Sequence, residues 1–190
     1  MILNFKCDYN PDISNSDDLN VEMAHLLSAQ SAAGSGANSR RRAPKLLAVA
    51  SGGGHWVQLL RVASAFQGCD VTYVSTHASY RSQVQGHKFL TVSDSSLSTK
   101  LGLIRTAIQL AAIVWTERPD IVVSTGAAPG YFALRLGRLF KARTIWLDSI
   151  ANVEKLSLSG AKIGRHADLW LTQWPHLAKP EGPHYEGSVI

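Results

Sequence analysis

The residues best suited to chemistry lie in one short segment, Ser51-Gly52-Gly53-Gly54-His55. It follows the apolar run 46–50, and apolar residues at helical spacing come directly after it. A strand that turns through glycines into a helix exposes backbone N–H groups at the helix N-terminus, where phosphate or another anion binds. We therefore expect this segment to hold an anionic ligand. The alternative is a tight turn in which glycine serves only the backbone conformation.

The spacing of the glycines excludes two common nucleotide sites. No third glycine opens the helix, so the dinucleotide pattern GxGxxG is missing, and no Gly-Lys-Ser/Thr follows, so a P-loop is missing as well. The next strand ends in VSTH, without the carboxylate that would recognise a ribose.

His55 is the candidate catalytic base. It would lie in the first turn of the helix, where the positive end of the helix dipole favours the neutral imidazole. A neutral imidazole accepts a proton from a substrate hydroxyl. The alternative is a simple cap or an anion contact.

Two further segments of small and polar residues follow later strands. Ser124 ends the run 121–124, and Thr125 and Gly126 follow it; these residues could hold a second anionic or sugar group, or only form a close turn. Asp148 and Asn152 follow the run 143–147 and would supply a carboxylate and an amide, with Asp148 orienting a sugar hydroxyl or His55. Glu154 either joins them or is a helix N-terminal charge.

Strand and helix patterns alternate along the chain and predict an α/β fold. Short apolar runs bounded by turns are typical of parallel strands covered on both faces, and a Rossmann-like doubly wound sheet is therefore expected. In such sheets ligands bind at the carboxyl ends of the strands, which places all three candidate segments on one edge. The expected strands are 46–50, 71–75, 89–92, 121–124, 143–147 and 169–172; the expected helices are 56–66, 100–116 and 131–140, with a polar, basic loop or helix near 157–165.

Composition divides the chain into a tail and one domain. Residues 28–38 are small and polar, and a short amphipathic helix is possible before them, so residues 1–43 are predicted to form a flexible tail and residues 44–190 the folded domain. The formal charge is +5, of which residues 1–42 contribute −1 and the remainder +6. A basic domain favours phosphorylated ligands or an anionic membrane surface.

Several classes of protein are disfavoured by what the sequence lacks. Two cysteines form no disulfide framework, and no His/Cys/Asp cluster has metal-ligand spacing, so no metal or other cofactor is expected. No dense basic stripe with interleaved aromatic residues points to nucleic acid. No signal peptide is evident, and no apolar run reaches the ~18 residues of a transmembrane helix.

The segment 100–116 is apolar almost all round its expected helix. Only Arg105, Thr106 and Gln109 interrupt it. Such a helix is either deeply buried or faces lipid or a partner protein. The basic residues Lys100 and Arg105 beside apolar surface would suit peripheral contact with a membrane.

Four motifs in order resemble the asparagine-linked glycosylation protein fourteen family, which includes PssD-type exopolysaccharide proteins. They are SGGGH after the first strand, STGAAPG after the fourth, IANVEKLSLSG after the fifth and ADLWLTQWP at the last. The resemblance covers about residues 45–175. It implies the acceptor-side half of a split GT-B glycosyltransferase whose single-chain relative is MurG-like, working with a smaller donor-side subunit of the thirteen or PssE type.

The resemblance also implies the reaction. The substrates would be a UDP-sugar, carrying N-acetylglucosamine or glucuronate, and a polyprenyl-diphosphate-linked saccharide. Gly52, Gly53 and Gly54 would lie near the diphosphate, and His55 would be the base of an inverting, metal-free transfer. The place would be the cytoplasmic face of a membrane, the bacterial inner membrane or, in a eukaryote, the endoplasmic reticulum. The alternative is a non-catalytic, nucleotide- or phosphate-binding Rossmann module.

Overall fold

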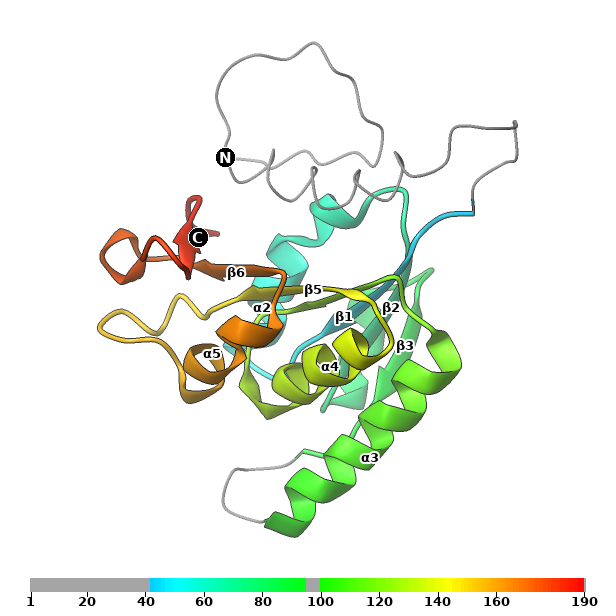
Figure 1. The fold of residues 1–190 in the computed structure, drawn as a ribbon. Coiled ribbons are helices and arrows are strands. Elements are labelled where there is room, and N and C mark those ends of the chain that lie inside the picture. Colours follow the sequence, from blue (N-terminus) through cyan, green and yellow to red (C-terminus); the bar gives the residue numbers. More distant parts are fainter. Residues whose placement is uncertain (1–41, 95–99, 190) are drawn as a thin grey trace, which may run out of the picture.

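The computed structural model describes residues 42–94 and 100–189 of this 190-residue chain. Most of the expected tail, and the short helix expected within it, lie outside the described residues. The described part forms a seven-stranded, entirely parallel sheet in the order β3-β2-β1-β4-β5-β6-β7 (Figure 1). Its strands are β1 (Lys45–Val49), β2 (Asp70–Ser75), β3 (Lys88–Thr91), β4 (Ile121–Ser124), β5 (Arg143–Leu147), β6 (Leu169–Thr172) and β7 (His184–Tyr185).

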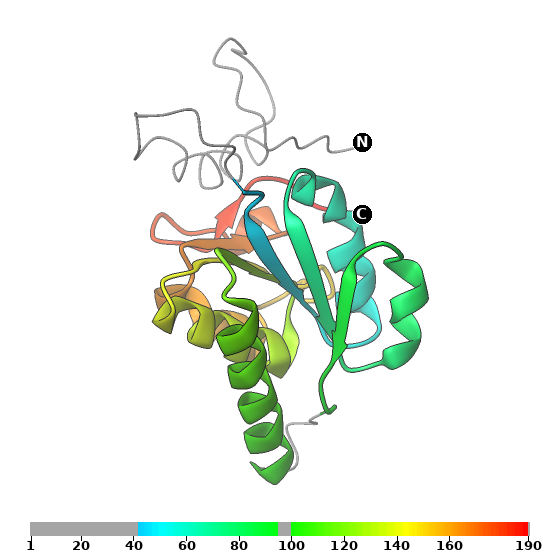
Figure 2. The ribbon, with the colours of Figure 1, turned by 90° about the vertical axis from the view of Figure 1, so that its right-hand side faces the viewer.

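Helices cover both faces of this sheet, which confirms the doubly wound α/β fold. One face carries α2 (Gly54–Arg61) and the 3-10 helix η1 (Ala63–Phe66). The other carries α3 (Lys100–Glu117), α4 (Ala127–Leu139) and α5 (Leu158–Ile163), as Figures 1 and 2 show. Short 3-10 helices complete the described elements: η2 (Ala78–Gln83), η3 (Gly164–His166) and η4 (Pro175–Leu177).

Alternate residues of the central strands supply the two cores. In β1, Leu46 and Ala48 pack towards α2, whereas Leu47 and Val49 pack towards α3 and α4. All four are at most 2 % exposed, which is why β1 reads as an uninterrupted apolar run and not as an alternating one.

Three details of the secondary structure differ from the sequence prediction. The expected helix 56–66 is divided, because α2 ends at Arg61 and η1 follows. The helix expected from residue 131 begins at Ala127, since Pro129 lies in its first turn, where a backbone N–H has no intrahelical partner. The two-residue strand β7 was not expected, because two residues carry no periodicity.

Successive strands are added on one side of β1 up to β3 and on its other side from β4 onwards, and this arrangement positions the candidate site. β2 lies on one side of β1 and β4 on the other, and Val49 is level with Ser124 in the pairing of β1 with β4. The turns after β1 and β4 therefore emerge side by side. This is the switch point at which doubly wound sheets bind ligands.

The helix α3 is confirmed, and one of its faces is exposed. Leu110 and Val114 are fully buried against the sheet, whereas Leu101, Ile104, Ile108 and Trp115 are 81 %, 56 %, 65 % and 59 % exposed. Figure 2 shows the first turns of α3 extending beyond the sheet. Of the two alternatives for an all-apolar helix, the structure favours a helix with one face open to lipid or a partner. No helix in residues 42–94 or 100–189 is long and apolar enough to cross a bilayer.

Candidate functional site

His55 joins the two turns at the switch point of the sheet. Its Nδ1 lies 2.9 Å from the carbonyl oxygen of Thr125, and the Thr125 hydroxyl donates to the His55 carbonyl at 2.7 Å. A carbonyl only accepts, so Nδ1 carries the proton and, in the neutral ring, Nε2 keeps its lone pair. The side chain is half-buried. The ring is thus held in the tautomer that a base acting through Nε2 requires.

Gly126 makes room for this arrangement. Its φ of 140° and ψ of −175° lie in a region that is essentially open to glycine alone. A Cβ atom at this position would also overlap the His55 ring. Gly126, in the turn after β4, therefore leaves the space that the ring of His55, in the turn after β1, occupies.

The hydroxyls of Ser124 and Thr125 are turned inward in this structure. Both residues are fully buried, and Ser124 Oγ accepts from the Gly126 N–H at 3.2 Å. Together with the Thr125 bond to His55, these contacts shape the turn. A direct contact of either hydroxyl with a ligand stays a prediction.

The glycine loop after β1 is packed against the segment that follows β2. A Cβ at Gly52 would overlap the His77 ring, so this glycine is needed for a close approach. The Gly53 N–H donates to the Tyr80 hydroxyl at 3.0 Å. Tyr80 in turn stacks on Trp56, with ring centroids 4.9 Å apart and planes 3° from parallel.

One expected anion donor, the Gly53 N–H, is therefore already bonded to Tyr80. Gly53 and Gly54 are exposed, and the Val57 N–H closes the first intrahelical bond to the Gly53 carbonyl at 3.2 Å. The N–H groups of residues 54–56 belong to the first turn of α2, where helices leave donors without intrahelical partners. Ser51, half-buried, accepts from the Ser75 hydroxyl through its carbonyl and thereby anchors the loop to β2.

Asp148 is buried and organises the loop between β5 and α5, residues 148–157, which we call the β5–α5 loop. The residue is 1 % exposed, and its carboxylate accepts from the Trp146 indole, the Asn152 amide and both the N–H and the hydroxyl of Ser157. Within the part of the chain that the structure describes, His55 bonds Thr125 and not Asp148. The expectation that Asp148 orients His55 is thus replaced by a role within its own loop.

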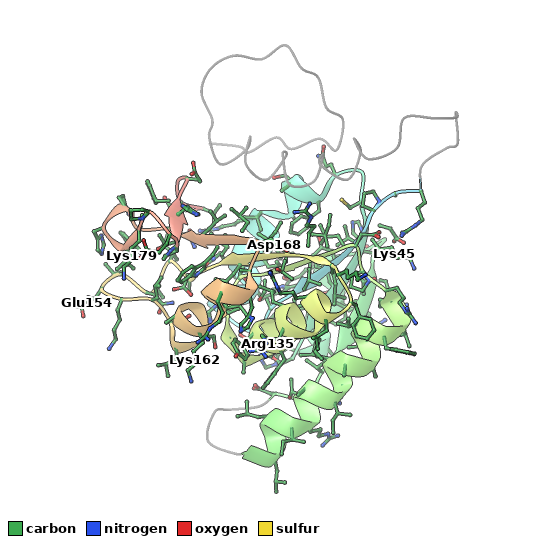
Figure 3. The ribbon with its side chains drawn as sticks, in the orientation of Figure 1. Lys45, Arg135, Glu154, Lys162, Asp168 and Lys179 are labelled. Carbon is green, nitrogen blue, oxygen red and sulfur yellow. The ribbon has the colours of Figure 1, made fainter. Side chains whose placement is uncertain are left out.

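The other two residues predicted in this loop lie nearer to solvent. Asn152 is half-buried and is held by its bond to Asp148 at 3.2 Å. Glu154 is exposed at the outer tip of the β5–α5 loop (Figure 3). It does not begin a helix, because α5 starts at Leu158 and Ser157 is its N-cap. Glu154 is thus available to a ligand or a partner chain.

Buried glutamines hold the β5–α5 loop, and sequence reasoning did not find them. Gln58 on α2 donates to the Asp148 carbonyl at 3.2 Å and accepts from the Ile150 N–H at 3.3 Å. Gln173, after β6, donates to the same carbonyl at 2.9 Å. The signal for Gln58 was a polar side chain between the apolar residues Val57 and Leu59, three positions after His55.

A basic cluster lies on α4 and the segment that follows α5. Arg135 Nη1 is 2.9 Å from His166 Nε2, and Arg138 forms an ion pair with Asp168 at 3.0 Å. Desolvation, with the charges of Arg135, Arg165 and Arg138, lowers the pKa of His166. The Arg135 guanidinium must donate, so His166 Nε2 accepts and is unprotonated there. Figure 3 labels two residues of this cluster, Arg135 and Asp168.

Comparison with known proteins decides the family. Residues 78–189 match the family described as "Oligosaccharide biosynthesis protein Alg14 like". The chain belongs to this family. The matched range includes the turns after β4 and β5, which carry Thr125 and Asp148, and begins after the glycine loop.

Fungal proteins show the same relationship. The "UDP-N-acetylglucosamine transferase subunit ALG14" of Yarrowia lipolytica is 27 % identical over 176 residues, which cover 77 % of this chain and 82 % of that protein. The Schizosaccharomyces pombe protein of the same description is 33 % identical over 88 residues, covering 42 % of each chain. The chain spans about half the length of the Debaryomyces hansenii relative (49 %).

Solved structures share the fold. MurG of Acinetobacter baumannii superposes with a TM-score of 0.62 at 15 % identity, over 76 % of this chain and 45 % of MurG. The UDP-GlcNAc 2-epimerase of Methanocaldococcus jannaschii superposes with a TM-score of 0.52 at 10 % identity, over 67 % of this chain and 39 % of the epimerase. The expected relation to MurG-like GT-B proteins is confirmed at the level of the fold.

Proposed function

We propose that this chain is the acceptor-side subunit of a two-chain inverting glycosyltransferase. Its donor substrate would be UDP-N-acetylglucosamine, and its acceptor a saccharide linked to a polyprenyl diphosphate. The observation that carries the proposal is the paired hydrogen bonding of His55 and Thr125 at the switch point of the sheet. Membership of the Alg14-like family, with relatives described as UDP-N-acetylglucosamine transferase subunits, supports the choice of donor.

His55 would act as the general base. With Nδ1 held by the Thr125 carbonyl, Nε2 takes the proton of the acceptor hydroxyl while that oxygen attacks the anomeric carbon of the sugar nucleotide. The bond from the anomeric carbon to the diphosphate of UDP breaks, UDP leaves with the electron pair, and the configuration inverts. No step of this displacement requires a metal ion.

The glycine loop would hold the diphosphate of the acceptor. Gly53 and Gly54 are exposed at the start of α2, and the helix dipole there favours a negative group. Asn152 and Glu154 of the β5–α5 loop would contact the acceptor saccharide or the partner chain. Asp148 would contribute by holding that loop, as its buried hydrogen bonds indicate.

A second chain would supply the donor side of the cleft. The described part of this chain forms one Rossmann-like unit and aligns with 45 % of the MurG chain, which supports the proposal of a separate donor-side subunit. The edge that carries His55 would face that subunit, because ligands in doubly wound sheets bind outside the carboxyl ends of the strands.

The exposed face of α3 would place the enzyme on the cytoplasmic face of a membrane. The face is formed by Leu101, Ile104, Ile108 and Trp115. Its helix of 18 residues is about 27 Å long at 1.5 Å per residue, and Arg118 lies over the Trp115 ring at 4.6 Å. Apolar side chains bordered by cations are typical of helices that lie in the interface of an anionic membrane.

The deciding experiment replaces His55 with asparagine. The Asn side-chain amide can still donate to the Thr125 carbonyl, whereas the base at Nε2 is lost. We expect transfer of N-acetylglucosamine to fall by at least ~100-fold, as loss of a general base predicts. His87→Asn, at an exposed histidine outside the site, is the matched control.

The assay measures transfer from UDP-N-acetylglucosamine to a short-chain polyprenyl diphosphate that carries one N-acetylglucosamine, with and without the donor-side chain. Unchanged transfer by His55→Asn would remove the proposed base. Full activity of the single chain would contradict the two-chain enzyme. Nucleotide binding by the single chain, without transfer in the presence of any partner, would instead indicate a non-catalytic binding module.

A further inference from the structure

One face of α2 connects three segments at the carboxyl edge of the sheet. This face carries side chains three positions apart, those of His55, Gln58 and Arg61, which therefore lie next to one another on the helix. His55 binds the turn after β4, Gln58 binds the β5–α5 loop, and Arg61 donates to the Val189 carbonyl at 3.2 Å.

Gln58 is the member of this series whose side chain is enclosed. It is 3 % exposed, and both ends of its amide are used: Nε2 donates to the Asp148 carbonyl and Oε1 accepts from the Ile150 N–H. These bonds join residues 90 and 92 positions apart in the chain. Burying a side-chain amide costs free energy unless both its NH2 group and its oxygen form hydrogen bonds, and in Gln58 both do.

Gln173 closes a second path between the same elements. It is 2 % exposed, donates to the Asp148 carbonyl and accepts from the Val189 N–H at 2.9 Å. Since Arg61 holds the Val189 carbonyl, a closed series of hydrogen bonds runs from Gln58 through Asp148, Gln173 and Val189 back to α2.

The β5–α5 loop depends on these anchors because it has no regular structure between β5 and α5. On the side of β6 the loop is held by the Trp174 indole, which donates to the Ile150 carbonyl at 2.9 Å, and by His176 at the Val153 carbonyl. On the side of α2 the direct link is Gln58. Loss of Gln58 would leave the loop attached to β6, and connected to the helix of His55 only indirectly, through Gln173, Val189 and Arg61.

We infer that Gln58 is a positioning residue that sets the β5–α5 loop relative to His55. The inference rests on the proposed function, in which the loop contacts the acceptor and His55 takes its proton. Reacting groups must be held about 3–3.5 Å apart for efficient transfer, so a loop that shifts independently of α2 would weaken productive binding of the acceptor.

The test compares Gln58→Met with Gln173→Met in the complex with the donor-side chain. Each substitution keeps the length of the side chain, removes one donor to the same Asp148 carbonyl and frees one backbone N–H. The two variants differ in which path they break: Gln58→Met removes the direct link between the loop and α2, whereas Gln173→Met removes the indirect path through Val189 and leaves the direct link in place.

We expect Gln58→Met to raise the KM for the acceptor probe, the short-chain polyprenyl diphosphate carrying one N-acetylglucosamine, about tenfold, the factor that one net buried hydrogen bond represents. The KM for UDP-N-acetylglucosamine should change by less than about twofold in both variants, and the KM for the acceptor probe should rise less in Gln173→Met than in Gln58→Met, because the direct link to α2 remains. Gln58→Glu keeps a side-chain oxygen that can accept from the Ile150 N–H. As the pH is lowered and the carboxyl regains a proton to donate, binding of the polyprenyl-diphosphate probe should recover.

Amide hydrogen exchange supplies a readout that does not need transfer. In Gln58→Met the Ile150 amide should exchange faster while the Val189 amide is unchanged, and in Gln173→Met the reverse should hold. Equal changes of acceptor KM in both variants, or an Ile150 amide that is unaffected by Gln58→Met, would overturn the inference. Absence of transfer by the unsubstituted pair, with the exchange pattern as expected, would instead overturn the proposed function.

Discussion

Replacing Gly54 with alanine separates what the fold requires from what a ligand requires. Gly54 is the first residue of α2, its φ is not in the left-handed region, and a Cβ built there meets no atom within 4 Å. The fold therefore does not need glycine at this position. Alanine should raise the free energy of unfolding by about 0.5 kcal/mol, because it restricts the unfolded chain, and should raise the Tm by about 1–2 °C.

The effect on acceptor binding should have the opposite sign. The Cα–Cβ bonds of a helix tilt towards its N-terminus, so the added methyl group would occupy the space in front of the first-turn N–H groups. If the acceptor diphosphate binds there, it loses about one charge-assisted hydrogen bond, worth about 1.5–3 kcal/mol, or roughly 10- to 150-fold in KM. Steady-state transfer at varied acceptor concentration, together with thermal unfolding, measures both effects on one preparation.

Gly53→Ala is the matched control. A Cβ at Gly53 also meets nothing within 4 Å, but its φ of 64° and ψ of −134° suit glycine, so alanine should destabilise the fold by about 1–3 kcal/mol. If Gly54→Ala proves stable and leaves the KM for the acceptor unchanged, the start of α2 does not hold the diphosphate.

Three further outcomes follow from the structure. Asp148→Asn should lower the free energy of unfolding in urea by about 2–4 kcal/mol. The buried carboxylate accepts hydrogen bonds on both oxygens, and the NH2 group of asparagine would face one set of these donors without being able to accept from them. The pKa of His166 is lowered in the folded chain, so the unfolded chain binds that proton at a higher pH than the folded chain does. The free energy of unfolding of the wild-type protein should therefore fall as the pH drops below 6.5. Unfolding measured at pH 5–7 should show that His166→Gln lacks this loss. Ile108→Glu, at a side chain 65 % exposed, should leave stability within about 0.5 kcal/mol but reduce flotation with anionic vesicles about tenfold or more, and unchanged flotation would remove α3 from the membrane contact.

Most of the fold was predictable because its signals are local. The strands β1, β2, β4 and β5 lie within one residue of the expected runs, since buried parallel strands are short and apolar throughout. The start of α4 was placed too late, at residue 131, because the small residues before it are typical of a turn, whereas they form the first turn of the helix with Pro129 in third position. Exposure of one face of α3 was not decided by the sequence, because both alternatives use the same apolar residues.

The candidate site was predictable in its parts and not in its connections. The turn chemistry of Ser51–His55 and of Ser124–Gly126 is written in consecutive residues, and so is the polar loop that begins at Asp148. The inward direction of the Asp148 carboxylate was not, since it depends on donors contributed by the folded loop and by Trp146.

By itself, the sequence determined that a glycine-rich turn and a histidine follow the first strand of a parallel sheet, and that two more polar turns follow later strands at the same edge. Only the tertiary structure decided that His55 meets Thr125 across 70 residues and that Gln58 meets Asp148 across 90. Local patterns specify strands and turns, because propensity and periodicity act between near neighbours. Contacts across the sheet depend on strand order and register, which exist only once the whole core has packed.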